Sequence, residues 1–160
     1  MRIGLCWAGA ATHPRDAQRS MPFDAMRPLL DMLPDAEWLN FCFGPRGQVD
    51  EPRLIPVEIP GGDYLDSARV LATCDLLITV DTSVLHLAGA LGVPVWALVS
   101  TLPDARWGLE IETSEWYETL RLFRQEQPFA WAPVIERVSA ALRLFVAQRI
   151  SPELFDQVGA

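Results

Sequence analysis

The sequence contains no lysine, and its thirteen cationic side chains are all arginine. With 21 acidic residues, the formal net charge is −8 at pH 7, which argues against a protein that binds nucleic acids or anionic membranes. No apolar run reaches about eighteen residues, so no membrane-spanning helix is expected. Any phosphate contact must therefore come from arginine, a hydroxyl group or a backbone N–H group.

Histidine and cysteine are also scarce, with two and three residues respectively. Cys6, Cys42 and Cys74 show no C-x-x-C spacing, and we expect buried, reduced thiols in a cytoplasmic protein. With so few ligands, we predict no metal and no cofactor. Met1 and Arg2 lead directly into an apolar, strand-like run, so no signal peptide is expected.

The most informative stretch is residues 76–98, LLITVDTSVLHLAGALGVPVWAL. Residues 76–80 form an apolar, β-branched run without alternation, which is typical of a parallel strand buried on both faces. A helix is expected from Ser83, ended by Gly92 in a left-handed conformation and by Pro94. Residues 95–98 form a second buried strand. The pattern predicts a β-α-β unit with a right-handed crossover.

Polar side chains gather at the turn of this unit. Thr82 and Ser83 begin the helix, where free N–H groups and the helix dipole favour an anion such as phosphate. Asp81 precedes them, and His86 lies one helical turn later on the same face. The alternative is purely structural, because Asp and Thr often serve as helix caps and a single histidine is often only packed.

The rest of the chain predicts a Rossmann-like α/β fold, an open parallel sheet with helices on both faces. We expect one domain over residues 1–150, followed by a C-terminal extension over residues 151–160. Further strands are expected at residues 2–8, 38–43, 54–59 and 120–123, and helices at 22–33, 64–73, 133–148 and from Ser151.

Two loops should meet the Asp81 turn, because both follow the carboxyl ends of strands. The first contains Gly9, Arg15 and Arg19, and the second contains Arg106. Arginines beside a helix N-terminus suit a diphosphate. Trp107 and Trp116 of the second loop are candidates for stacking on a base or sugar ring, or for covering the edge of the sheet; the first loop is equally readable as an exposed connection.

The string DTSVLHLAGALGVPVW, residues 81–96, resembles a motif of the heptosyltransferase-like glycosyltransferases of family 9. The segments IGLCWAG, RSMP and the later RW, SEWY and LRLFRQ extend the resemblance over about residues 1–145. The sequence is most similar to the bacterial relatives that are fused behind tetratricopeptide repeats.

The resemblance implies the donor-binding half of a GT-B enzyme, which transfers a hexosyl or heptosyl group from a nucleotide sugar without a metal. It implies that Arg19 and His86 are catalytic, with Arg19 neutralising the leaving diphosphate. It implies that six further residues bind the donor: Gly9, Arg15, Asp81, Thr82, Ser83 and Arg106. An acceptor domain or partner chain would complete the enzyme, and the chain would be inactive alone.

Two other functions stay open at this point. The chain could be a non-catalytic nucleotide-sugar-binding or assembly module that forms homo-oligomers. It could also be another Rossmann-like enzyme, such as an epimerase, although no G-x-G-x-x-G follows the first strand.

Overall fold

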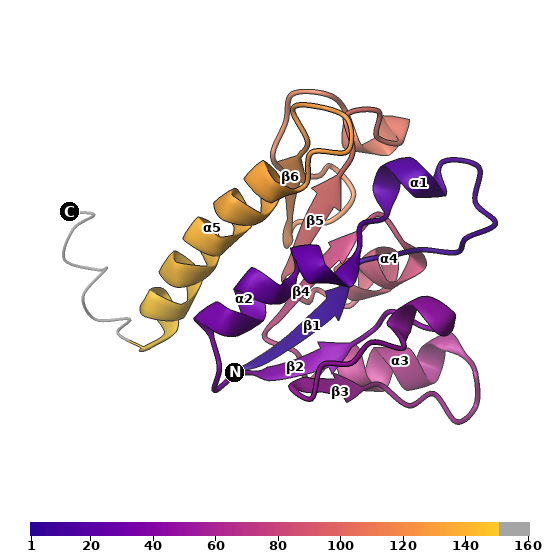
Figure 1. Cartoon of the computed structure of the whole chain (residues 1–160), viewed down its shortest axis with the longest axis vertical. Helices are drawn as coiled ribbons and strands as arrows, with labels where there is room; N and C mark the ends of the chain where they lie inside the picture. Colours follow the sequence, from indigo (N-terminus) through magenta and orange to yellow (C-terminus); the bar gives the residue numbers. More distant parts are fainter. Residues whose placement is uncertain (151–160) are drawn as a thin grey trace.

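A computed structural model describes residues 1–150 of the chain. Its six strands form a single parallel sheet in the order β3-β2-β1-β4-β5-β6 (Figure 1). The predicted open parallel α/β sheet is confirmed. The short helix predicted from Ser151 lies outside the described residues.

The elements alternate between strand and helix over most of the chain. The strands are β1 (Arg2–Cys6), β2 (Glu37–Asn40), β3 (Leu54–Pro56), β4 (Leu76–Val80), β5 (Val95–Val99) and β6 (Leu120–Arg124). The α-helices are α1 (Asp16–Arg19), α2 (Arg27–Met32), α3 (Tyr64–Leu71), α4 (Ser83–Ala90) and α5 (Ala132–Ile150). Three short 3-10 helices cover Phe23–Ala25, Pro45–Gly47 and Ala105–Trp107.

The order in which the chain adds strands reverses between the two central strands, β1 and β4. From β1 the chain builds β2 and β3 on one side, then returns to β4 and builds β5 and β6 on the other. Cys6 at the end of β1 pairs with Thr79 near the end of β4, so the two strands end together. In open α/β sheets, ligands bind in the crevice beyond the carboxyl ends of the strands at this point.

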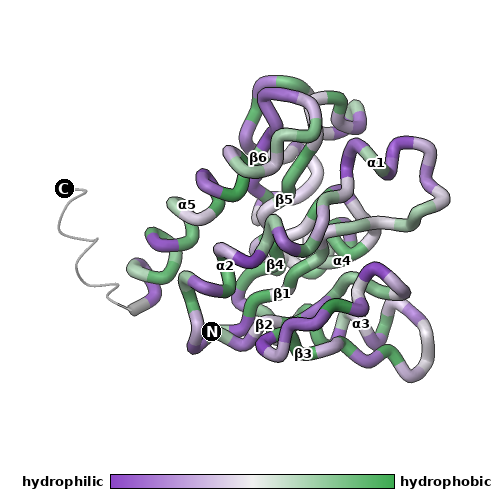
Figure 2. The backbone as a smooth tube through the Cα atoms, in the orientation of Figure 1, coloured by the Kyte–Doolittle hydropathy of each residue, from purple (hydrophilic) through white to green (hydrophobic). Residues whose placement is uncertain are grey.

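The helices cover the sheet as two pairs. α2 packs beside α5, and α3 packs beside α4 (Figure 1). β4 and β5 are buried along their whole length, as expected for strands between two helical layers. Figure 2 shows hydrophobic residues along the central strands and an alternation of hydrophobic and hydrophilic residues along α5, which turns Val134, Val138 and Leu142 into the core.

Several predicted boundaries are wrong for local reasons. The helix expected over residues 22–33 is a 3-10 helix followed by α2, with Pro28 in the first turn of α2. Proline has no N–H group and its ring collides with the carbonyl four residues earlier, so one continuous helix cannot form. β2 ends at Asn40 rather than at residue 43, because the Asn40 amide binds the backbone of Cys42 and Gly47.

The helix α3 begins as the sequence predicts. Oδ1 of Asp63 accepts hydrogen bonds from the N–H groups of Leu65 and Asp66 at 2.9 and 3.1 Å, which satisfies two of the free donors at the helix start. On α3, Leu65 is exposed, and Ser67 and Leu71 are buried.

The β4–α4–β5 unit matches its prediction. α4 begins at Ser83, and Gly92 has a φ of +70° just after its last turn. Glycine adopts this left-handed conformation without steric cost, which allows the chain to turn back into β5. Within residues 1–150, no helix is long and apolar enough to cross a membrane.

Candidate active site

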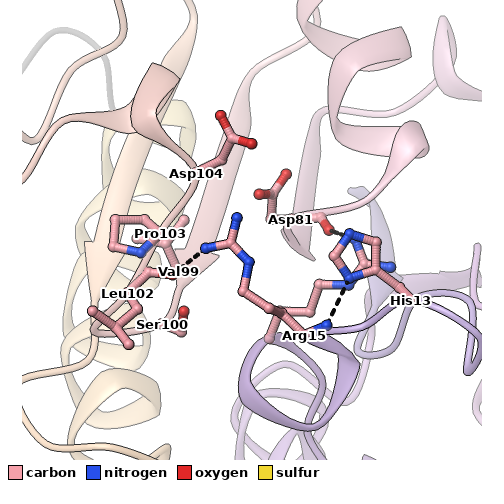
Figure 3. A pocket seen from close by; sticks show the side chains of 9 residues that line it. His13, Arg15, Asp81, Val99, Ser100, Leu102, Pro103 and Asp104 are labelled. Carbon is pink, nitrogen blue, oxygen red and sulfur yellow. Dashed lines mark hydrogen bonds between the residues drawn. The ribbon is translucent and has the colours of Figure 1, made fainter.

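A pocket lies beyond the ends of the central strands, where the sheet order reverses (Figure 3). It is formed by the loops that follow β1, β4 and β5, as the sequence predicts. Its volume is about 50 Å³. It is lined by His13, Arg15, Arg19, Asp81, Val99, Ser100, Leu102, Pro103 and Asp104.

Arg19 connects the first loop to the turn after β4. Its Nη1 donates a hydrogen bond to the carbonyl oxygen of Asp81 at 2.9 Å. Gly9 makes this position possible, since a Cβ atom there would lie 2.3 Å from Nη2 of Arg19. Gly9 was predicted to bind the ligand; in the structure it provides the space in which the guanidinium lies.

Arg15 spans the opening of the pocket. Its Nη1 donates a hydrogen bond to the carbonyl oxygen of Leu102 at 3.4 Å, and its backbone N–H donates to Nδ1 of His13 (Figure 3). The side chain is exposed, so it can leave Leu102 for an anion at little cost. The two arginines of the first loop, Arg15 just before α1 and Arg19 at its end, therefore reach the same pocket.

Thr82 and Ser83 present different groups at the start of α4. The Thr82 hydroxyl lies 3.2 Å from Oγ1 of Thr79 and 3.8 Å from Sγ of Cys6, and the residue is buried. This hydroxyl faces the sheet, so the predicted contact between it and an anion does not fit this structure. Ser83 is exposed, and the Thr82 side chain does not cap the helix. The first backbone N–H groups of α4 have no acceptor within the helix.

Asp81 is held by a tryptophan from a distant loop. Oδ2 of Asp81 accepts a hydrogen bond from Nε1 of Trp107 at 3.0 Å, and Oδ1 lies 3.9 Å from Nε2 of His86. Trp107 is completely buried and cannot stack on a ligand, whereas Trp116 is 67% exposed. The predicted stacking role is therefore wrong for Trp107, which orients Asp81 instead.

His86 is fixed on both ring nitrogens. Nε2 lies 3.0 Å from Nη1 of Arg106, and Nδ1 lies 3.1 Å from the hydroxyl of Tyr117. Arginine can only donate, so Nε2 must accept and Nδ1 carries the proton. The ring also stacks on Trp107, with 5.6 Å between centroids and 13° between planes. His86 thus braces the loop after β5 against α4.

Arg106 is bound within its own loop. Its Nε donates to Oδ1 of Asp104 at 2.8 Å, and its Nη1 contacts His86. Asp104 lines the pocket, whereas Arg106 lies outside this lining. The predicted contact between Arg106 and a phosphate would require the Arg106–Asp104 ion pair to open.

Arg124 at the end of β6 was not predicted. Its guanidinium donates to the carbonyl oxygens of Trp107, Gly108 and Ile111, with 3.0 Å to Gly108 and 2.7 Å to Ile111. Burial lowers its pKa. By holding these carbonyl groups, Arg124 fixes the loop that places Trp107 on Asp81. No sequence signal could have paired a cation with three backbone groups of another segment.

The environment of His86 predicts a pH-dependent stability. Burial, and then the neighbouring Arg106, lower its pKa from the ordinary 6.5, partly opposed by Asp81 and Asp104. Just below pH 6.5 the unfolded chain therefore binds more protons at this position than the folded chain does. The free energy of unfolding consequently decreases as the pH is lowered through this window. We expect the urea midpoint of the wild type to drop between pH 7.5 and 5 by more than that of His86→Gln. Equal pH dependence in both proteins would contradict this result.

Comparisons with known proteins complete the description of the site. Residues 63–140 match the family model of glycosyltransferase family 9 (heptosyltransferase). The match covers just under half of the chain, from the start of α3 into α5. This region includes Asp81, Ser83, His86 and Arg106, whereas Arg19 precedes it.

Two known proteins that are similar to this chain over most of its length are much longer than it. Protein FlbA of Caulobacter vibrioides is 30% identical over 155 residues, which is 91% of this chain and 26% of FlbA. The structure of Escherichia coli ADP-heptose LPS heptosyltransferase II superimposes with a TM-score of 0.63 at 19% identity, covering 92% of this chain and 47% of that one. The chain spans about a quarter of FlbA and half of the heptosyltransferase, and its fold is that of one half of a GT-B structure.

Proposed function

We propose that this chain is the donor-binding half of a GT-B glycosyltransferase that transfers a hexosyl or heptosyl group from a nucleotide sugar. The observation that carries the proposal is the meeting of Arg19 with the start of α4 at the point where the sheet order reverses. Arg15 and Arg19 line the pocket, and α4, whose first N–H groups and dipole favour an anion, begins two residues after Asp81. The family 9 match and the coverage of half a GT-B structure support the same function.

The pocket fits part of the donor only. Its volume of about 50 Å³ is well below the roughly 300–1,000 Å³ of typical ligand pockets. A phosphate group can occupy it, while the rest of the donor extends over the open side. We therefore propose that an acceptor domain or partner chain closes this side, with residues 1–150 as the donor domain. We also propose that the chain forms homo-oligomers. It would belong to a cytoplasmic protein in which this domain follows tetratricopeptide repeats.

In the proposed reaction, an acceptor hydroxyl attacks the anomeric carbon of the donor sugar. The bond from that carbon to the phosphate oxygen breaks, and its electron pair stays on the leaving phosphate. Arg19, Arg15 and the first N–H groups of α4 stabilise this charge, which is electrostatic catalysis by preorganised donors. Asp81 and His86 keep these donors in place. The base that takes the acceptor proton would come from the other half.

The neutral state of His86 gives it a defined part in this proposal. With its proton on Nδ1, the ring supplies an acceptor at Nε2 and holds the Arg106 guanidinium beside the turn. His86 is then a positioning residue for the arginine, and it acts as an acid only if Arg106 moves away.

A thermal-shift series on the unaltered chain tests the proposed function. Ligands that bind the native state raise the melting temperature by mass action. We expect no shift with the nucleosides adenosine, uridine and guanosine. One of the corresponding nucleoside diphosphates should raise the melting temperature, and the sugar nucleotide with the same base should raise it further. A CMP-linked sugar tests whether one phosphate suffices. Shifts that do not depend on phosphate would contradict the proposal.

A non-catalytic nucleotide-sugar-binding module is the second candidate. Both candidates predict nucleotide binding. They differ when a separately purified acceptor half is added to the chain: sugar transfer from the bound donor supports the enzyme, and binding without transfer or hydrolysis supports the module.

A further inference from the structure

Two cysteines that the proposed function does not use lie side by side behind the first loop. Sγ of Cys6, at the end of β1, donates a hydrogen bond to the carbonyl oxygen of Ala8 at 3.5 Å, and Sγ of Cys42 donates to the same oxygen at 3.6 Å. The two thiols also interact with each other. They meet because β1 and β2 are neighbouring strands, about 4.8 Å apart, and a disulfide bond joins Cα atoms about 4.4–6.8 Å apart. The pair is therefore placed to form a disulfide bond.

Cys6 is the more reactive of the two thiols. Its hydrogen bond with Cys42 lowers the pKa of Cys6, and the hydroxyl groups of Thr82 and Thr79 lower it further, although burial opposes them. The same interaction, together with burial, raises the pKa of Cys42. The thiolate is the form of cysteine that reacts with oxidants, so an oxidant attacks Cys6 first and Cys42 is left to close the bond.

A hollow on the surface ends close to this pair. Its volume is about 370 Å³, and Ala8 lines it together with residues of α1 and of the loop after β2. Because the carbonyl group of Ala8 holds both thiols, one residue separates the hollow from the two sulfur atoms. Cys6 and Cys42 are 2% and 4% exposed, so a small movement of the exposed residues 10–15 admits hydrogen peroxide but excludes large reagents.

We propose that Cys6 and Cys42 form a redox switch, in which hydrogen peroxide converts the two thiols to a disulfide bond. The Cys6 thiolate attacks one peroxide oxygen, the O–O bond breaks, and the leaving hydroxide takes up the proton that Cys6 had released. This step gives a sulfenic acid on Cys6. The sulfur of Cys42 then attacks the sulfur of Cys6, the S–O bond breaks, and the thiol proton leaves with the hydroxyl group as water. Two thiols are oxidised, and one peroxide is reduced to two water molecules.

The disulfide bond acts on the nucleotide pocket through the turn formed by Ala8 and Gly9. Its formation removes both thiol donors from the Ala8 carbonyl oxygen and draws the two sulfur atoms to about 2 Å from each other. The turn cannot absorb this change freely, because a Cβ atom on Gly9 would lie 2.3 Å from Nη2 of Arg19. Oxidation thus displaces Arg19 from the turn after β4 and weakens nucleotide binding. This consequence rests on the proposed function, whereas the disulfide bond itself does not.

The first measurement counts thiols in the full chain. The reduced protein is treated with hydrogen peroxide, denatured, alkylated and mapped by mass spectrometry of its peptides. We expect one alkylated cysteine in place of three, a linked peptide pair that contains Cys6 and Cys42, and recovery of all three thiols with dithiothreitol. Cys42→Ala should form no disulfide bond.

Cys74→Ala is the matched control. Cys74 is buried as well, but it precedes β4 next to Asp75, whose N–H group binds the carbonyl oxygen of Arg2. It therefore lies at the opposite edge of the sheet, beyond the reach of a disulfide bond to Cys6. This variant should still form the bond between Cys6 and Cys42. Circular dichroism confirms that each variant is folded.

The second measurement is titration calorimetry with ADP, UDP and GDP. For the diphosphate that binds the reduced wild type, we expect oxidation to raise the dissociation constant about tenfold and dithiothreitol to restore it. Cys74→Ala should respond in the same way. In Cys42→Ala, peroxide should leave the dissociation constant within about twofold of its value before treatment.

Three results would overturn the inference. Three alkylated cysteines after peroxide treatment, or oxidation of Cys6 without a bond to Cys42, would mean that the two thiols do not form a redox pair. A disulfide bond that leaves the affinity unchanged would mean that the pair does not control the pocket, although the proposed function stands. If no diphosphate binds the reduced wild type, the proposed function fails and the switch fails with it, whereas a disulfide bond found in the peptide map would stand.

Discussion

Replacing Trp107 by alanine is expected to lower the free energy of unfolding by about 3–5 kcal/mol, the usual cost of removing a buried aromatic side chain. Trp107 is completely buried, donates to Asp81 and stacks on His86. Because domains are stable by only about 5–15 kcal/mol, this single change approaches the limit of what the fold tolerates. Urea denaturation at constant m-value measures the loss.

Two variants separate packing from hydrogen bonding at this position. Trp107→Phe keeps an aromatic ring but removes the N–H group that binds Asp81, so it should cost less stability and still weaken nucleotide binding. Trp116→Ala is the control, since Trp116 is 67% exposed, and its effect should stay within about 0.5 kcal/mol. Equal losses for Trp107→Ala and Trp116→Ala would contradict the central position of Trp107.

Replacing Arg19 by alanine is expected to raise the dissociation constant for the preferred nucleotide by about 10- to 100-fold. A hydrogen bond to a charged group contributes about 1.5–3 kcal/mol, and every 1.4 kcal/mol is a factor of ten. The dissociation constant of Arg19→Lys should lie between those of the wild type and Arg19→Ala. Lysine keeps the charge but loses the planar guanidinium that reaches Asp81 and a phosphate together. Calorimetric titration of each variant measures the change.

The control for Arg19 must remove the same charge elsewhere. Arg143→Ala does so on an exposed part of α5, and should leave the dissociation constant within about twofold. A loss equal to that of Arg19→Ala would mean that net charge, and not the pocket, governs binding. An unchanged affinity in Arg19→Ala would remove Arg19 from the proposed site.

The β-α-β unit around Asp81 could be predicted because its signals are local. An unbroken apolar run, a capping turn and Gly92 each specify their own backbone conformation, and neighbouring residues supply all of them. The same logic placed the first loop beside the turn, since parallel strands end at one edge of a sheet. The break before α2 was missed although its cause, Pro28, is also local.

The contacts that organise the site could not be predicted in this way. Trp107 and Asp81 are 26 positions apart, and Arg124 binds carbonyl groups of a loop that has no regular structure to announce its course. The direction of the Thr82 hydroxyl depends on Thr79 and Cys6, which belong to two strands. Side-chain direction at a turn follows from tertiary packing, and residue type alone does not determine it.

The central position of β1 limits where this protein can be divided. The region that matches the family 9 model, residues 63–140, contains β4, β5 and β6 but neither β1 nor the complete α5. Cutting the chain there would strip the fully buried β4 of its neighbour and leave an apolar edge open to pairing with other chains. The stretch that carries the sequence signature is therefore not a unit that can be expressed, exchanged or inherited alone. The first sixty residues supply β1, β2 and β3, which complete the sheet on which this stretch depends.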